Sequence, residues 1–140
     1  MTTILFACVE NTAQSQMAAA LLNRKANPTR VVAISAGIRP GGAVPPVIVD
    51  VMAEAGIDVA GVRAQLLTVG IMRQADWVIL MGNAGGVHLL PHLRRETWPV
   101  GDPFAGSMQH ARHVRDELTA RIDELLARLE GHGGFGGRAA

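Results

Sequence analysis

The stretch from Ile4 to Ala18 constrains the fold of this chain most strongly, because it joins an apolar run to a polar loop and then to an alanine- and leucine-rich segment. The run 4–7 predicts a short buried strand, and Ser15 is expected to open a helix. Cys8, the one cysteine of the chain, then lies at the C-terminal end of that strand. Backbone N–H groups in such a loop, together with the helix dipole, bind anions and favour the thiolate form of a cysteine. The stretch therefore predicts a reactive thiol beside an anion-binding loop.

The rest of the chain alternates short apolar runs with helical patterns. Further strands are expected at 30–35, 77–81 and 96–100, further helices at 45–56, 67–73 and 107–129, and loops at 36–44 and 57–65. This alternation predicts an α/β fold of three layers, in which a four-stranded parallel sheet is flanked by helices. We expect a single domain over 1–130 and a disordered, glycine-rich tail over 131–140.

Composition argues against several classes of function. A formal net charge of +1 gives no electrostatic case for binding nucleic acid. No apolar run approaches the roughly 20 residues of a membrane span, and residues 1–3 lack the basic flank of a signal peptide, so a cytoplasmic protein is expected. One cysteine allows no internal disulfide, and no acidic residue lies between His88 and His92 to complete a metal site. We therefore expect no metal and no cofactor, and leave a homodimer open.

Ligands of parallel α/β sheets bind beyond the carboxyl ends of the strands. The loops expected at that edge carry Cys8 to Gln14, Ile38 and Arg39, Asn83, and Asp102. We expect these four loops to converge on one site for a small molecule.

The loop at Cys8 resembles the signature of the low-molecular-weight protein tyrosine phosphatases and of the thiol-dependent arsenate reductases that share their fold. That signature reads C-x-x-x-x-x-R-S, usually followed by x-M-A, and it is matched at Cys8, Asn11, Ser15, Met17 and Ala18. The segment 101–104 resembles the Asp-Pro of the family, whose aspartate is the general acid. The resemblance covers the chain to about residue 130.

The resemblance implies a role for each matched residue. Cys8 would attack phosphorus or arsenic as a thiolate, while the loop 9–13 binds the substrate oxygens through its N–H groups. Ser15 would donate its hydroxyl to the thiolate, with or without capping the helix, and Asn11 would adopt a left-handed backbone. Asp102 would protonate the leaving group or hold a substrate hydroxyl. The candidate catalytic residues are thus Cys8, Ser15 and Asp102, and the candidate substrate-binding residues are Val9, Glu10, Asn11, Thr12, Ala13, Gln14, Arg39, Asn83 and Phe104.

Gln14 departs from the signature, because it stands at the arginine position. The arginine binds two oxygens of a dianion through a charged planar fork, whereas glutamine offers one neutral NH2 and one acceptor oxygen. A competent phosphatase would then need another cation, for which Arg39 and Arg63 are candidates. Ala13 and Asn83 stand where the thioredoxin-linked arsenate reductases are expected to carry further cysteines, so an internal disulfide relay is impossible.

These observations favour a cysteine-based enzyme that has been repurposed for a neutral or singly charged small organic substrate, for example in a biosynthetic tailoring step. Cys8 would act as nucleophile or proton carrier, Asp102 as acid or base, and Gln14 would hydrogen-bond to the substrate in both directions. Two alternatives stay open: a slow phosphatase or arsenate reductase relative with a substitute arginine, and a non-catalytic module that binds a phosphorylated or anionic partner. The loop 36–47 would serve as a lid or as a dimer surface.

Overall fold

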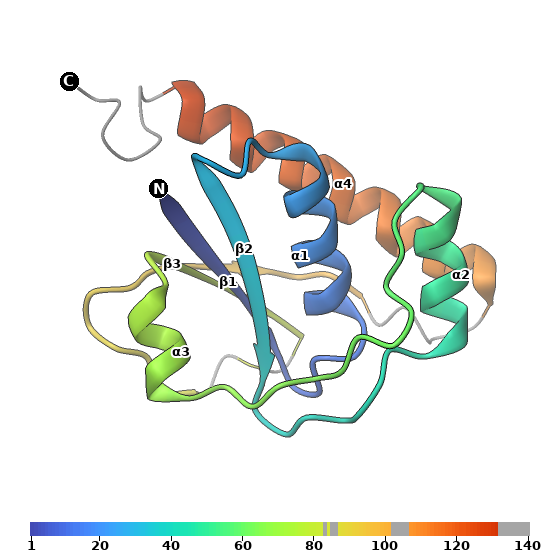
Figure 1. The fold of residues 1–140 in the computed structure, drawn as a ribbon, viewed down its shortest axis with the longest axis horizontal. Helices are drawn as coiled ribbons and strands as arrows, with labels where there is room; N and C mark the ends of the chain where they lie inside the picture. Colours follow the sequence, from blue (N-terminus) through green and yellow to red (C-terminus); the bar gives the residue numbers. More distant parts are fainter. Residues whose placement is uncertain (83, 85–86, 102–106, 132–140) are drawn as a thin grey trace.

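The computed structural model describes residues 1–82, 84, 87–101 and 107–131. Its strands are β1 (Thr2–Cys8), β2 (Val31–Gly37), β3 (Trp77–Met81) and β4 (Arg94–Trp98), and its helices are α1 (Gln14–Lys25), α2 (Pro46–Glu54), α3 (Val69–Gln74) and α4 (Met108–Gly131). The strands form one four-stranded sheet in the order β2-β1-β3-β4. Every neighbouring pair is parallel (Figure 1), which confirms the predicted fold class.

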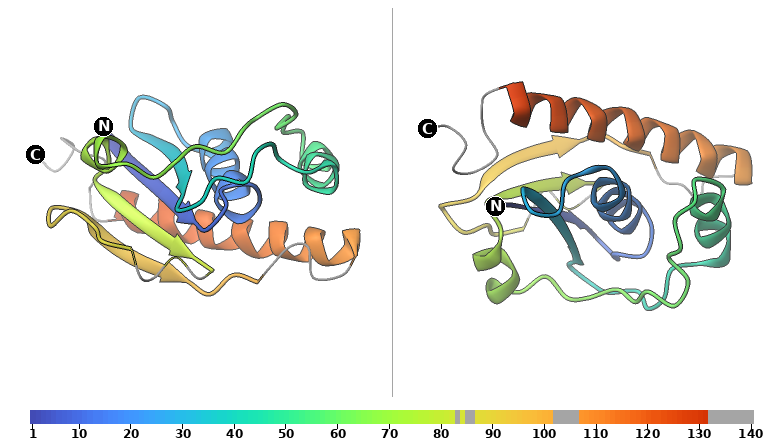
Figure 2. Two further views of the ribbon diagram at one scale, coloured as in Figure 1. Left: turned by 90° about the horizontal axis from the view of Figure 1, so that it is seen from below. Right: turned by 45° about the horizontal axis from the view of Figure 1, so that its top comes forward.

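Alternate residues of β1 supply the two cores of the protein. Ile4, Phe6 and Cys8 belong to the larger buried cluster, which α1, α2 and α4 complete on one face of the sheet. Leu5 and Ala7 belong to the second cluster, to which α3 contributes on the opposite face. Figure 2 shows α4 along one side of the sheet and α3 on the other. Because β1 is buried on both faces, its sequence is a continuous apolar run rather than an alternating one.

α4 packs against the sheet through one apolar face. Val114, Leu118, Ile122 and Leu125 recur at helical spacing and are all buried, as their periodicity predicts. The helix continues to Gly131, so the residue at which the tail was expected to begin is still helical. Residues 132–140 lie outside the described residues, and the division into a domain and a tail stays a prediction.

The fourth strand begins and ends two residues earlier than the predicted range 96–100. β4 occupies Arg94–Trp98 and pairs only with β3, at the edge of the sheet. Arg94 and Arg95 are exposed, as is common on edge strands, so the apolar pattern used for the prediction placed the strand too late. Pro99 has no N–H with which to extend the ladder.

Two helices begin at other residues than predicted. α1 begins at Gln14, its N-cap residue is Ala13, and no side chain caps it. Ser15 therefore lies inside the helix, and the expectation that it opens or caps α1 is wrong. α3 begins at Val69, later than the predicted residue 67, because the hydroxyl of Thr68 accepts a hydrogen bond from the first turn.

Candidate active site

Cys8 lies where the topology predicts, as the last residue of β1. β1 is one of the two inner strands of the sheet (Figure 1). Its side chain is only 3% exposed. The loop 9–13 leads from it directly into α1, and the Met17 N–H closes the first turn on the Ala13 carbonyl at 2.8 Å. The strand, loop and helix predicted around the cysteine are therefore present.

The loop leaves several backbone N–H groups available to a ligand. Within the described ranges, the amides of Glu10, Thr12, Ala13 and Gln14 have no hydrogen-bond acceptor. These donors lie at the N-terminus of a helix of 12 residues, where the helix dipole also favours negative charge. The arrangement can hold an oxygen atom that carries or develops negative charge.

The sulfur of Cys8 is held by two polar neighbours. Its Sγ lies 2.9 Å from the hydroxyl oxygen of Ser15, and it accepts a hydrogen bond from the Asn11 N–H at 3.2 Å. The side-chain amide of Asn11 donates to the same Ser15 oxygen at 2.7 Å. The expected contact between Ser15 and the thiol is thus present.

Asn11 adopts the left-handed backbone that its residue type allows, with φ at 57°. Its side-chain oxygen accepts hydrogen bonds from the Gln65 N–H at 2.9 Å and from the Gln16 amide at 3.3 Å. The Gln16 amide also donates to the Arg63 carbonyl at 3.3 Å. Sequence reasoning missed Gln16 and Gln65, because neither is part of the matched signature and Gln65 lies 54 residues from Asn11 along the chain.

Gln14 lies between the carboxyl ends of two other strands. Its Nε2 donates to the carbonyl oxygens of Val100 and Gly101, at 3.3 and 3.1 Å. A Cβ placed on Gly82, directly after β3, would lie 3.7 Å from both polar atoms of the same side chain. Gln14 therefore connects the signature loop to the segments that follow β3 and β4, while its expected hydrogen bond to a substrate stays a prediction.

The loop after β2 is hydrogen-bonded to the loop after β1. The N–H groups of Ile38, Arg39 and Gly41 donate to three successive carbonyls of the loop at 3.2, 2.8 and 2.9 Å. A Cβ on Gly37 would lie 2.8 Å from the Val9 carbonyl oxygen, so only glycine allows this close approach. The loops after β1 and β2 thus converge as predicted.

Three charged side chains flank the signature loop. Glu10, Arg39 and Arg63 are exposed, and within the part of the chain that the structure describes none of them forms an ion pair. The Glu10 carboxylate oxygen lies 2.8 Å from the Cβ position of Gly41, and the Arg63 guanidinium lies 3.8 Å from that of Gly42. The rim of the site therefore carries one negative and two positive charges that are free to meet a ligand.

Three of the predicted site residues, Asn83, Asp102 and Phe104, lie outside the described residues. The backbone immediately before two of them, at Gly82 and Gly101, belongs to the described part and lies beside Gln14. Their roles stay predictions.

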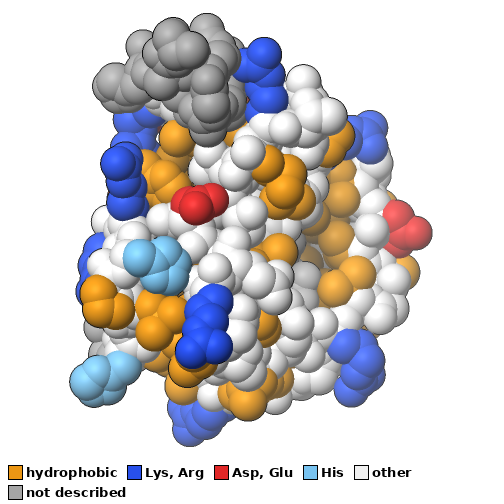
Figure 3. Space-filling view, turned by 60° about the vertical axis from the view of Figure 1, so that its left-hand side comes forward, with side chains coloured by type: hydrophobic (Ala, Val, Ile, Leu, Met, Phe, Trp, Pro, Cys, Tyr) orange, Lys and Arg blue, Asp and Glu red, His pale blue; other side chains and the backbone are white. Residues whose placement is uncertain are grey.

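The described residues contain no group of three or more His, Cys, Asp or Glu side chains that could hold a metal ion. His92 instead lies with its Nε2 2.9 Å from the Ala75 carbonyl oxygen. On the face drawn in Figure 3, acidic, basic and histidine side chains lie scattered rather than gathered into one patch. None of the helices in the described ranges combines the length and the hydropathy needed to cross a membrane.

Comparison with known proteins confirms the resemblance seen in the signature. Arsenate reductase 1 of Bacillus cereus is 35% identical over 123 residues, which cover 86% of this chain and 90% of that protein. A probable low molecular weight protein-tyrosine-phosphatase, EpsP of Ralstonia solanacearum, is 29% identical over 144 residues and covers 94% of this chain and 98% of its own. The solved structure of the YwlE arginine phosphatase from Geobacillus stearothermophilus superposes with a TM-score of 0.82 at 30% identity, over 95% of this chain and 96% of that one.

The sequence profile of the family described as low molecular weight phosphotyrosine protein phosphatase matches residues 3–133, nearly the whole chain. The similar proteins include both phosphatases and arsenate reductases, so the matches do not separate the two activities. The chain belongs to the low molecular weight phosphotyrosine protein phosphatase family.

Proposed function

We propose that this protein is a cysteine-dependent enzyme that acts on a small organic substrate carrying at most one negative charge at the reacting centre. One observation carries the proposal. The Cys8 sulfur accepts a hydrogen bond from the Asn11 N–H and lies 2.9 Å from the Ser15 hydroxyl oxygen, while position 14 holds a neutral amide that donates to backbone carbonyls. The polar contacts of the nucleophile are thus in place, whereas the permanent cation that the signature carries at position 14 is absent.

Two residues within the signature loop support a preference for weakly charged substrates, whereas Arg39 and Arg63 at its rim favour the second candidate given below. Gln14 cannot neutralise a phosphate or arsenate dianion, and the exposed carboxylate of Glu10 adds a negative charge within the signature loop itself. Removing one contact to the developing oxyanion typically lowers the rate by about a hundredfold to a thousandfold.

The proposed reaction is group transfer through sulfur. The Cys8 thiolate forms a bond to an electrophilic carbon or phosphorus, the bond from that atom to the leaving oxygen breaks, and the leaving oxygen takes up a proton. Asp102 is our candidate for the donor of that proton. Water then attacks the covalent intermediate and regenerates Cys8, while Ser15 and Asn11 hydrogen-bond to the departing sulfur.

A slow phosphatase or arsenate reductase with a substitute arginine is the second candidate. It is favoured by the position of Arg63, whose carbonyl is bonded to Gln16 and whose guanidinium lies over Gly42 at the rim of the loop. Arg39 is anchored to the loop in a similar way, through its N–H to the Val9 carbonyl at 2.8 Å. Either guanidinium would supply the missing charge if its side chain turned inward.

Three nitrophenyl esters that release the same chromophore test the charge preference. We expect the protein to turn over a neutral nitrophenyl acetate and a singly charged nitrophenyl methylphosphonate, each with a burst of nitrophenol, and to turn over the doubly charged nitrophenyl phosphate slowly. Cys8→Ser should abolish the burst. Gln14→Arg should raise phosphate turnover relative to acetate turnover by about a hundredfold or more.

Faster turnover of the phosphate than of either other ester by the unchanged protein would contradict the proposal. Loss of that activity in Arg39→Ala or Arg63→Ala would then identify the substitute cation, with Arg73→Ala, an exposed arginine in α3, as the matched control. Competition by inorganic phosphate without turnover of any ester would instead indicate a binding module.

A further inference from the structure

We infer that Gln16 is a positioning residue for Cys8, because it holds the Asn11 amide in the orientation that directs the Ser15 hydroxyl proton toward the sulfur. The inference rests on the proposed function only in taking Cys8 as the reacting group. Gln16 does not touch the sulfur itself and acts through two intervening side chains.

The direction of each hydrogen bond follows from the chemistry of its donor. The backbone N–H of Gln65 can only donate, so the Asn11 atom that it contacts at 2.9 Å must be the acceptor oxygen. The other end of the Asn11 amide is then its NH2 group, which donates to the Ser15 oxygen at 2.7 Å. Ser15 has one hydroxyl proton, and the remaining neighbour of its oxygen is the Cys8 sulfur at 2.9 Å.

The Gln16 amide supports this orientation from a second side. Gln16 is 8% exposed, and its NH2 group has two protons for two acceptors, the Asn11 side-chain oxygen and the Arg63 carbonyl. A flipped Asn11 amide would point its own NH2 at both the Gln16 NH2 and the Gln65 N–H. Two donor pairs, one buried and one partly buried, would then face each other, which is unfavourable.

Gln16 also fixes the segment that provides the second donor. By bonding to the Arg63 carbonyl it ties residues 63–65 to α1, and the Gln65 side chain ties the same segment to the Ser35 carbonyl at 2.8 Å. Without Gln16, the Asn11 side-chain oxygen accepts only the hydrogen bond from the Gln65 N–H. The segment 63–65, which carries that N–H, also loses its hydrogen bond to α1. The Ser15 proton is then free to turn away from the sulfur.

The rate at which iodoacetamide alkylates Cys8 tests this chain of contacts, because the thiolate is the reacting form and the protein has no other cysteine. We expect Gln16→Met, which keeps the length and loses the donors, to lower the rate at neutral pH by about fivefold, the equivalent of one net hydrogen bond. The rates should be equal in strongly alkaline solution and in denaturant. Gln74→Met, at an exposed position at the end of α3, is the matched control and should leave the rate unchanged.

A double-mutant cycle separates positioning from a general loss of stability. If Gln16 acts through Ser15, then Gln16→Met should have no further effect on the alkylation rate in a Ser15→Ala background. Gln16→Asn keeps the amide but is one methylene too short to bridge both acceptors. Gln16→Asn should therefore lower the alkylation rate of Cys8 by a smaller factor. It replaces Gln16→Met in the test if the methionine variant does not fold.

The inference would be overturned if Gln16→Met lowered the alkylation rate equally in the unchanged protein and in the Ser15→Ala background. It would also be overturned if Gln16→Met lowered the melting temperature and left the alkylation rate unchanged at every pH. The charged side chains on the described segments that pack against the network, Glu10, Arg39 and Arg63, are the same in every variant. Alkylation needs no substrate. Failure to turn over any nitrophenyl ester would therefore refute the proposed function and leave this inference standing.

Discussion

Gln14 lacks the positive charge of the signature arginine but makes backbone contacts that an arginine could also make. Gln14 donates to the carbonyl oxygens of Val100 and Gly101. An arginine side chain carries only donors, so the same two carbonyls could accept its guanidinium. Gln14→Arg can therefore restore the charge and the bidentate fork of the signature arginine without removing this contact to the backbone.

Gly37 sets how closely the two loops at the site approach each other. A Cβ at this position would lie 2.8 Å from the Val9 carbonyl oxygen and 2.9 Å from both the Cβ and the N of Asn11. Most of these atoms belong to the backbone and cannot turn aside. We expect Gly37→Ala to lower the free energy of unfolding by about 1–3 kcal/mol and to slow alkylation of Cys8.

Chemical denaturation and alkylation rates measure both effects. Gly70→Ala is the matched control. Gly70 lies in α3, and a Cβ at this position would contact only the Thr68 hydroxyl, at an ordinary 3.8 Å. That variant should be neutral or slightly more stable. An unchanged alkylation rate in Gly37→Ala would show that the loop tolerates displacement, contrary to this account.

The resemblance to the family signature was sufficient to predict the contact of Cys8 with Ser15 and the left-handed backbone of Asn11. It was insufficient for Gln16 and Gln65, because their partners are set by tertiary approach. Arg63 lies 47 residues from Gln16 along the chain, and no spacing rule connects them. Polar residues of this kind become visible only when the segment between α2 and α3, which carries Arg63 and Gln65, folds back over the signature loop.

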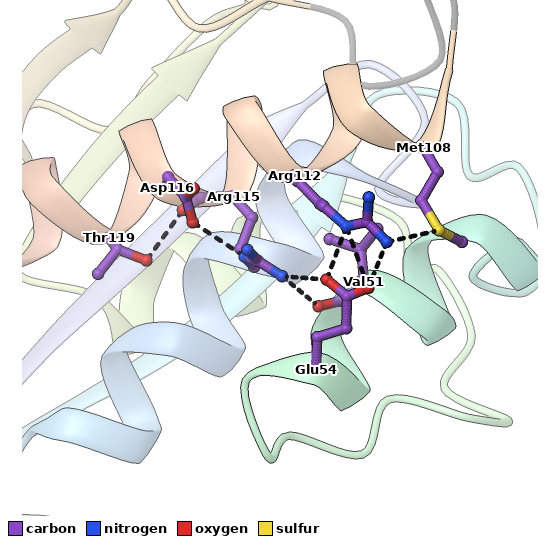
Figure 4. A network of polar contacts seen from close by, with 7 residues as sticks. All are labelled: Val51, Glu54, Met108, Arg112, Arg115, Asp116 and Thr119. Atoms are coloured by element: carbon purple, nitrogen blue, oxygen red, sulfur yellow. Dashed lines mark hydrogen bonds and ion pairs between the residues drawn. The ribbon is translucent and has the colours of Figure 1, made fainter.

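At the scale of elements, a network of ion pairs joins α2 to α4 (Figure 4). Glu54 accepts hydrogen bonds from Arg112 at 3.0 and 2.8 Å and from Arg115 at 2.8 Å. The hydrogen bonds from Arg112, and then the one from Arg115, lower the pKa of Glu54 from 4.5 to about 2. Because the pKa is lower in the folded state, Glu54 stabilises the protein fully above pH 4.5, and this contribution is lost as the pH falls toward 2.

We therefore expect Glu54→Gln to be less stable than the unchanged protein at neutral pH, and the difference to shrink steadily as the pH falls below 4.5. Unfolding by denaturant across this range measures the difference. Glu117→Gln is the control, because Glu117 pairs with Arg121 inside α4 at 3.5 Å and joins no second element. A stability gap for Glu54→Gln that stays constant down to the lowest pH would mean that the network does not act through its charge.

The strand bounds show where patterns of apolar residues are informative. β1 and β3 lie inside the sheet, and their apolar runs located them well. β4 lies at the edge with Arg94 and Arg95 exposed, and the same pattern placed it too late. β2 lies at the other edge, yet its apolar and β-branched residues predicted it at 30–35, close to the observed Val31–Gly37. β4 was misplaced because its first two residues are charged, not because it lies at an edge.

For the molecule as a whole, the order of elements along the chain determines where a site can lie. Alternating strands and helices predicted a parallel sheet, and a parallel sheet brings the carboxyl ends of its strands to one edge. The structure places Cys8, Gln14, Gly82 and Gly101 together there. The substrate depends instead on a few loop side chains, which the topology leaves free to vary.

The sheet also divides the interior into two cores, and this arrangement predicts how core substitutions combine. Leu5 and Leu118 are both fully buried, Leu5 in the cluster that includes α3 and Leu118 in the cluster on the opposite face. Each change to alanine should lower the free energy of unfolding by about 2–5 kcal/mol. Because the sheet separates the two side chains and they share no partner cluster, the double variant should show the sum of the two effects within about 0.5 kcal/mol.

Urea unfolding, followed by both tryptophan fluorescence and far-ultraviolet circular dichroism, measures these free energies. If the two cores form one cooperative unit, both signals should change in a single transition for every variant, since β1 contributes to both faces. The conservative changes Leu5→Met and Leu118→Met serve as controls and should lower the free energy of unfolding by less than about 1.5 kcal/mol. Two separate transitions would mean that the two cores unfold independently. A large departure from additivity would mean that the two cores are coupled through the sheet.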